Sequence, residues 1–100
     1  MVMIDVCTYP LESTEEMVKR FMKLPPVPDY ISIKGHYIRH VEKDGVQSIL
    51  IYEFDADRYA EASEHISKRW MAFYGVPGFT GSSQPWLEAV EAIKLLQEMQ

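Results

Sequence analysis

Two histidines and two acidic residues are spaced so that they could lie on neighbouring strands. His36 and His40 fall in a segment of alternating residue types, and Glu53 and Asp55 end a second such segment after the Asp44-Gly45 pair. Asp-Gly between two such runs favours a type I′ hairpin, because both central residues need a positive φ. Counting outward from that turn places His36 opposite Glu53. A carboxylate beside an imidazole raises its pKa, which suits a general base acting on an acidic C–H or a phenol.

The same count sorts the hairpin into a mixed face and an apolar face. The mixed face carries, in cross-strand pairs, Lys34 with Asp55, His36 with Glu53, Ile38 with Ile51, and His40 with Ile49. The apolar face carries Tyr37 with Tyr52, Arg39 with Leu50, and Gly35 with Phe54, and is expected to pack under helices. Opposed side chains lie about 5 Å apart, so the charged pairs would be in contact. A change of register by one residue would exchange the two faces.

The elements that must position these residues follow from periodicity and from helix and turn signals. Residues 2–8 alternate as a strand, and Ser13 with Glu16 forms a capping-box pattern that starts a helix. Prolines 25, 26 and 28 end that helix. The later elements are expected to be strands at 30–41 and 46–54, a helix from about Asp57 to Gly75, a strand at 76–83, and a helix after Pro85.

This order predicts an α+β fold with an antiparallel sheet, namely a ferredoxin-like βαββαβ unit with an additional C-terminal helix. Residues 1–100 are expected to form a single domain, since 100 residues suffice for one core and not for two. In a ferredoxin-like sheet the first strand adjoins the third. Asp5 could therefore lie near Glu53, although their register is open.

Composition narrows the class of partner. Fifteen acidic against ten basic residues give a net charge of -5, which argues against nucleic acid and anionic membranes as partners. No apolar run is long enough to cross a bilayer. The one cysteine, Cys7, excludes an internal disulfide, and no secretory signal pattern precedes it, so we expect a cytoplasmic protein.

The mixed face of the sheet predicts a homodimer. With helices on one side of the sheet, Ile38, Ile49 and Ile51 would form an exposed apolar patch on the other. A second copy of the same chain is the simplest cover for that patch. Two facing sheets would also enclose a cavity into which the mixed face points.

At the level of element order and turns, the chain resembles the dimeric α/β-barrel superfamily, and within it small bacterial proteins of unknown function. The resemblance covers nearly the whole chain and includes the segments Leu24-Pro25-Pro26 and Val76-Pro77-Gly78-Phe79. It implies a ferredoxin-like fold and dimerisation. It does not imply one activity, because the superfamily includes cofactor-free monooxygenases, isomerases, haem enzymes and ligand-sensing domains.

Metal and cofactor chemistry are weakly indicated. His36 and His40 are four residues apart, about 13 Å along a strand, which is too far for one ion. One histidine with Asp5, Glu53 or Cys7 could complete a site, but that spacing is not a recognised metal motif, and a lone histidine is the only haem-ligand feature, so we expect no metal and no cofactor. The ordinary interpretation of His65 is a solvated helix residue, and that of Cys7 a small residue of the core or cavity wall.

Three hypotheses remain open at this point, including whether the protein is an enzyme. The first is a homodimer that binds a small apolar or aromatic molecule on the open sheet face, near Asp5, Lys34, His36, Ile38, His40, Ile51, Glu53 and Asp55. The second is a cofactor-independent monooxygenase-like or isomerase-like enzyme, with His36 as base and Glu53 as its orienting carboxylate. The third is a structural dimer without a site, in which cross-strand charge pairs hold the sheet together.

Overall fold

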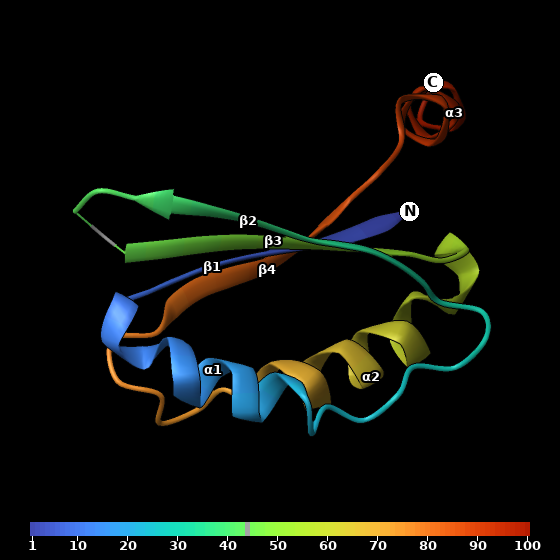
Figure 1. Ribbon diagram of the computed structural model, residues 1–100. Coiled ribbons are helices and arrows are strands. Elements are labelled where there is room, and N and C mark those ends of the chain that lie inside the picture. Colours follow the sequence, from blue (N-terminus) through green and yellow to red (C-terminus); the bar gives the residue numbers. More distant parts are fainter. Residues whose placement is uncertain (44) are drawn as a thin grey trace.

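A four-stranded antiparallel sheet forms the centre of the molecule (Figure 1). The computed structural model describes residues 1–43 and 45–100. The strands are β1 (Val2–Tyr9), β2 (Ser32–Val41), β3 (Gly45–Glu53) and β4 (Thr80–Trp86), in the spatial order β2-β3-β1-β4. The predicted α+β class and antiparallel sheet are confirmed.

The helices lie on two sides of this sheet. A short 3₁₀ turn η1 (Leu11–Ser13) leads into α1 (Thr14–Phe21), and η2 (Ala56–Arg58) leads into α2 (Tyr59–Met71). Figure 1 shows α1 and α2 along one face, whereas α3 (Ala89–Glu98) stands beyond the end of β4 on the opposite side. The three helices expected from the sequence are therefore present, and the sheet face away from α1 and α2 is open.

The core lies between the sheet and the helices α1 and α2. Strands β1 and β3 alternate buried and half-buried residues along their whole length, as expected for a sheet with helices on one face. The most deeply buried side chains are Tyr52, Ala62 and Ile66, each no more than 1% exposed. Residues four apart on α2 thus face the middle strands, as the helical spacing predicted.

The register between β2 and β3 differs from the predicted one. Val41 pairs with Gly45, whereas a two-residue turn would have placed Lys43 opposite Val46. Of the predicted turn pair, Asp44 lies outside the described residues. Gly45 instead opens β3 at a φ of 88°, where an added Cβ would lie 2.5 Å from the backbone carbonyl oxygen that ends β1. Because it has no side chain, Gly45 allows the start of β3 to pack closely against the end of β1.

The changed register at the turn exchanges the predicted faces of β2 between the turn and His36, and a β-bulge then returns Lys34 to its predicted face. Between the pair Lys34–Ile51 and the pair Tyr37–Ile49, β2 contains one residue more than β3. Gly35 lies in the bulge with a φ of 111°, and a Cβ there would be 2.9 Å from the Ile49 carbonyl oxygen. Because side chains alternate with a period of two, one extra residue in β2 exchanges the faces on the two sides of the bulge.

The consequence is a correction to the predicted hairpin surface. His36, Ile38 and His40 lie on the side of the sheet that α1 and α2 cover, and not on the open face. Tyr37 and Arg39 lie on the open face, where the Arg39 Nε–H donates to a Gln47 side-chain oxygen at 2.6 Å. Lys34 precedes the bulge and keeps its predicted face.

The predicted capping box at the start of α1 is also absent. Ser13 makes no side-chain cap to the helix, because its hydroxyl donates to the Pro77 carbonyl oxygen at 2.6 Å. Glu16 accepts a hydrogen bond from the Arg20 Nε–H at 2.9 Å. Ser13 therefore binds a partner 64 residues away, and Glu16 forms an i,i+4 ion pair within α1 in place of the capping box.

The last strand begins later than predicted. Residues 76–79 form a turn in which the Phe79 N–H donates to the Val76 carbonyl oxygen at 3.2 Å, with Gly78 at a φ of 74°. Proline followed by a glycine at positive φ is typical of a type II turn. The strand starts at Thr80 after this turn and continues to Trp86.

Candidate functional site

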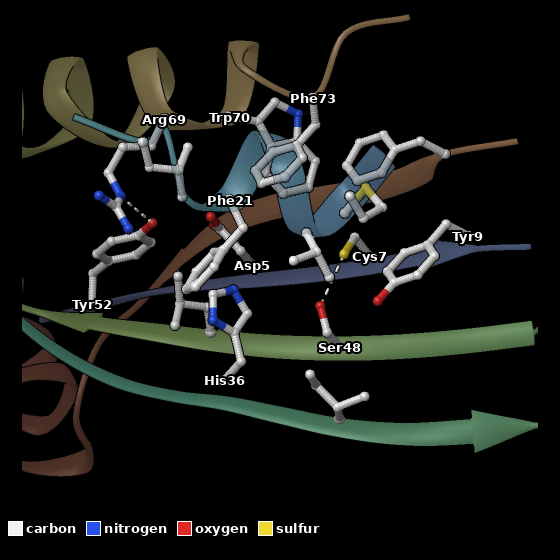
Figure 2. A pocket seen from close by; sticks show the side chains of 16 residues that line it. Asp5, Cys7, Tyr9, Phe21, His36, Ser48, Tyr52, Arg69, Trp70 and Phe73 are labelled. Carbon is white, nitrogen blue, oxygen red and sulfur yellow. Dashed lines mark hydrogen bonds between the residues drawn. The ribbon is translucent and has the colours of Figure 1, made fainter. Parts of the chain in front are cut away.

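A cavity of about 320 Å³ lies between the sheet and the helices α1 and α2 (Figure 2). This volume is within the range of about 300–1,000 Å³ that is typical of small-molecule sites. Six large apolar side chains from the helices, the sheet and the neighbouring loops form much of its wall: Met17, Leu24, Leu50, Trp70, Phe73 and Phe79. The polar side chains that face it are few and buried or half-buried, so each of them is informative.

The guanidinium of Arg69 occupies one end of the cavity. Arg69 is only 8% exposed. The Nε–H donates to the Tyr52 hydroxyl at 3.0 Å, as Figure 2 shows, and Nη1 donates to the Pro25 carbonyl oxygen. These two bonds use two of the five N–H groups. No carboxylate oxygen of the described residues lies within 4 Å of the guanidinium.

Asp5 is the carboxyl group of the cavity wall. It lies on the buried face of β1, opposite Leu50 of β3 and Ser83 of β4, and it is 8% exposed. The Ser83 hydroxyl donates a hydrogen bond to Oδ1. Burial raises the pKa of Asp5 to about 6, although the Ser83 bond and the charge of Arg69 both oppose that rise. The carboxyl group therefore exchanges its proton close to neutral pH.

His36 stands near the mouth of the cavity. Its ring meets that of Phe21 edge to face, with centroids 4.6 Å apart. Phe21 and Val18 of α1 and Ile38 of β2 line the cavity but are 44–63% exposed, so the opening lies between α1 and the edge strand β2. Burial, with a smaller effect of Arg69, lowers the pKa of His36. The imidazole is therefore neutral at pH 7.

Cys7 and Ser48 form a second polar pair on the sheet side of the cavity, away from Arg69. The Cys7 sulfur and the Ser48 hydroxyl are 3.0 Å apart, and Figure 2 shows them between Asp5 and Tyr9. Burial raises the pKa of the Cys7 thiol. The cysteine is thus a neutral thiol of the cavity wall, and its pKa shift is opposite to that of a reactive thiolate.

Together these groups give the cavity a polar end and an apolar end. Arg69 is permanently charged, and a guanidinium can hold a carboxylate or stabilise a developing oxyanion. Asp5 can accept or release a proton near neutral pH. The aromatic wall formed by Trp70, Phe73 and Phe79, whose rings contact one another in two pairs, is suited to a flat apolar molecule.

The structure brings together three of the eight predicted site residues, namely Asp5, His36 and Ile38, in this cavity. It does not form the predicted pair of His36 and Glu53. Glu53 lies across from Ser32 and Val2, and His36 falls within the bulge. The expected rise in the pKa of His36 is accordingly replaced by a decrease.

The other predicted site residues lie outside the cavity. Glu53 forms an ion pair with Lys34, with Oε1 and Nζ 2.7 Å apart. Ile51 is half-buried on the open face opposite Lys34, and Asp55 is exposed before η2. His40 lines a shallow hollow near η1. The mixed face predicted from the hairpin is thus divided between the two sides of the sheet.

Sequence reasoning missed Arg69, although a signal was present. Residues 62, 66 and 69 are spaced i, i+4 and i+7, which is the buried stripe of α2. A charged residue within such a stripe is unusual, because arginine is rarely buried without a partner. Arg69 could therefore have been singled out, but its Tyr52 and Pro25 contacts depend on the tertiary fold.

Two features are absent from the described residues, 1–43 and 45–100. Among them no group of three or more His, Cys, Asp or Glu side chains is arranged to hold a metal ion. None of their helices combines the length and the hydropathy that a bilayer span requires.

Comparison with known proteins adds no family. No protein-family model matches the chain, and no curated protein matches it. The class of this protein is therefore defined by its fold alone, which is α+β with a four-stranded antiparallel sheet and three helices.

Proposed function

We propose that this protein binds a small, mainly apolar molecule, of aromatic character, in the cavity between the sheet and α1 and α2. The observation that carries the proposal is the cavity itself, whose aromatic wall converges with Arg69, Asp5 and His36. Ligand sites are typically apolar with a few placed polar groups. A buried arginine and a buried carboxyl group that are more than 4 Å apart are costly for folding alone, which favours a role in binding.

Calorimetric titration with 1-naphthylmethanol, a neutral bicyclic alcohol, tests this proposal. Wild-type protein should bind one molecule per chain. Val18→Trp, at the cavity mouth, should weaken binding at least about tenfold, a loss of roughly 1.4 kcal/mol. The matched control Met71→Trp, on α2, 56% exposed and outside the cavity wall, should bind as wild type does. Absence of binding, or unchanged affinity in Val18→Trp, would contradict the proposed site.

We further propose that the protein acts as a homodimer, in which α3 and the open sheet face are covered by a second copy. Three apolar residues of α3, Val90, Ile93 and Leu96, are 55–76% exposed in the single chain. On the open face Tyr37 is 58% exposed beside Ile49. An amphipathic helix normally buries its apolar stripe, so these surfaces need a partner.

The surface area of the chain supports a second copy as that partner. The accessible surface is 7021 Å², whereas a compact monomer of 11.6 kDa exposes roughly 5,800 Å². The radius of gyration is 15.4 Å, against about 13 Å for a compact domain of this length. The excess of roughly 1,200 Å² exceeds the ~800 Å² that each partner buries in a standard interface.

The finer assignment of the fold belongs to the same proposal. The strand order β2-β3-β1-β4, with helices after β1 and β3 on one face, supports a ferredoxin-like unit. Pairing two such sheets through their open faces would produce a dimeric α/β barrel. In that arrangement the two facing sheets would enclose the cavity predicted from the sequence. This proposed cavity is separate from the one under the helices α1 and α2.

A cofactor-independent enzyme is the second candidate, and the environment of Asp5 favours it over the predicted pair of His36 and Glu53. Asp5 faces the cavity with a pKa of about 6, close to the value that suits a general base. In such a reaction the Asp5 carboxylate takes a proton from an acidic C–H, and the electron pair moves to the adjacent carbonyl oxygen. Arg69 would stabilise the enolate oxygen until the proton returns.

Proton exchange on 2-tetralone, a bicyclic ketone, tests this candidate. In D₂O the wild-type protein should accelerate replacement of the acidic C1 protons, followed by the loss of their NMR signal. Asp5→Asn should abolish the acceleration, while Asp29→Asn, at an exposed acidic residue, should retain it. Equal rates with Asp5→Asn and wild type would exclude Asp5 as the base.

A further inference from the structure

The ionisable groups that face the cavity define its electrostatic character. They come from four elements: Asp5, Cys7 and Tyr9 of β1, His36 of β2, Tyr52 of β3, and Arg69 of α2. The residues of α1 in the wall are apolar. At pH 7 the imidazole, the thiol and both phenols are neutral, because burial lowers the pKa of His36 and raises those of the other three. Of the described groups that face the cavity, Arg69 is the one that carries a permanent charge.

Asp5 neutralises this charge only in part. Its carboxyl group is engaged by the Ser83 hydroxyl, and its oxygens lie more than 4 Å from the guanidinium nitrogens, since no ion pair forms between them. A buried carboxylate in contact with a guanidinium would have a lowered pKa, whereas that of Asp5 is raised. The guanidinium therefore retains N–H groups and charge for another acceptor.

We propose that the molecule bound in this cavity is an aromatic carboxylate, held through its carboxylate by the guanidinium of Arg69. The inference rests on the proposed cavity function and specifies its ligand. A guanidinium presents parallel N–H donors that match the two oxygens of a carboxylate. Burying a doubly charged phosphate would require further cations, and Arg69 is the only cationic side chain that lines the cavity among the described residues.

The layout of the wall fits such a ligand. Figure 2 shows Arg69 and Tyr52 at one end, with Trp70 and Phe73 above the space that extends from there toward Tyr9. A carboxylate at the arginine end would direct its ring system along these aromatic side chains. The Tyr52 hydroxyl, which accepts the Arg69 Nε–H, keeps its own proton to donate to the ligand.

Binding of an anion also links the site to the protonation of Asp5. A carboxylate ligand at Arg69 competes with ionised Asp5 for the same positive charge, so the ligand binds best when Asp5 is protonated. Burial lowers the pKa of His36, so its imidazole is neutral at pH 7 and adds no positive charge for the ligand. Affinity for the carboxylate therefore decreases above pH 6, by up to about tenfold per pH unit. The ligand itself remains ionised throughout.

The test compares three probes that share one ring system: 1-naphthoate, neutral 1-naphthylmethanol and cationic 1-naphthylmethylamine. At pH 6, wild-type protein should prefer 1-naphthoate to the alcohol by about 10- to 100-fold, the value of a charge-assisted hydrogen bond, and should not bind the amine. Arg69→Gln should abolish the preference. Lys68→Gln, an exposed neighbour on the same helix, should preserve it.

Two further variants keep the inference testable if Arg69→Gln does not fold. Arg69→Lys retains the charge and should retain part of the preference, and Asp5→Asn should make the affinity for 1-naphthoate independent of pH between 6 and 8. If wild-type protein binds the alcohol as tightly as 1-naphthoate, the charge inference is wrong while the cavity function stands. If none of the probes binds, both are wrong.

Discussion

Replacing Asp5 by asparagine should stabilise the protein at neutral pH. The side chain keeps its size, and its amide oxygen can still accept the Ser83 hydrogen bond. What is removed is a carboxyl group that must ionise at a site only 8% exposed. The pKa of Asp5 rises from 3.8 to about 6 on folding. At ~1.4 kcal/mol per pKa unit, the ionised group destabilises the folded protein by roughly 3 kcal/mol.

The direction of the pH dependence follows from the raised pKa. Between about pH 4 and pH 6 the folded protein holds a proton on Asp5 that the unfolded chain has lost. The wild-type free energy of unfolding therefore falls as pH rises through this interval, and the full penalty remains above it. Asp5→Asn lacks this contribution, so it should be more stable than wild type by about 1 kcal/mol near pH 4.5 and by about 3 kcal/mol at pH 7.5.

Urea unfolding at a series of pH values measures this difference directly. Exposed carboxyl groups contribute equally to both proteins and cancel in the comparison. Asp29→Asn, at an exposed position, should follow the wild-type curve. Parallel curves for wild type and Asp5→Asn over the whole range, or a variant less stable at pH 7.5, would refute the proposed environment of Asp5.

Three other variants test separate parts of the structure. Gly35→Ala forces a side chain into the bulge at a φ of 111° and should cost about 1–3 kcal/mol in urea unfolding; an unchanged midpoint would contradict the bulge. Ile93→Glu should convert a dimer to a monomer in light scattering, whereas Lys94→Glu should not; a wild-type monomer would end the dimer proposal. Ser83→Ala removes a bond that lowers the pKa of Asp5, so carboxyl NMR should show that pKa above about 6, and a lower value would contradict the bond.

Much of the fold was predictable because it depends on local patterns. Alternation along β1 and β3, the helical spacing of Ala62 and Ile66, and the prolines after α1 each act within a few residues. The class, the antiparallel sheet and the order of the elements follow from such signals. The boundary of β4 was displaced because Pro77 and Gly78 form a turn where the pattern suggested the start of a strand.

The site was less predictable because it depends on strand register. The count from the Asp44-Gly45 pair assumed a two-residue loop and a regular strand. Val41 instead pairs with Gly45, and this odd-numbered shift moves His36 from the open face to the helix side, whereas the Gly35 bulge restores the predicted face at Lys34. Ser83, the partner of Asp5, is 78 residues away in sequence. Tyr52 and Pro25, the partners of Arg69, are 17 and 44 residues away, so these contacts arise only from tertiary packing.

The two tryptophans allow the most direct test of the cavity proposal. Trp70 lines the cavity, and Trp86 lies at the end of β4, 55% exposed and outside it. An NMR titration with 1-naphthoate at pH 6 would follow both indole N–H signals, assigned with Trp70→Phe. We predict a saturable shift of the Trp70 signal at one ligand per chain and a constant Trp86 signal. A shift confined to Trp86, or no shift of either signal, would contradict binding in the cavity under α1 and α2.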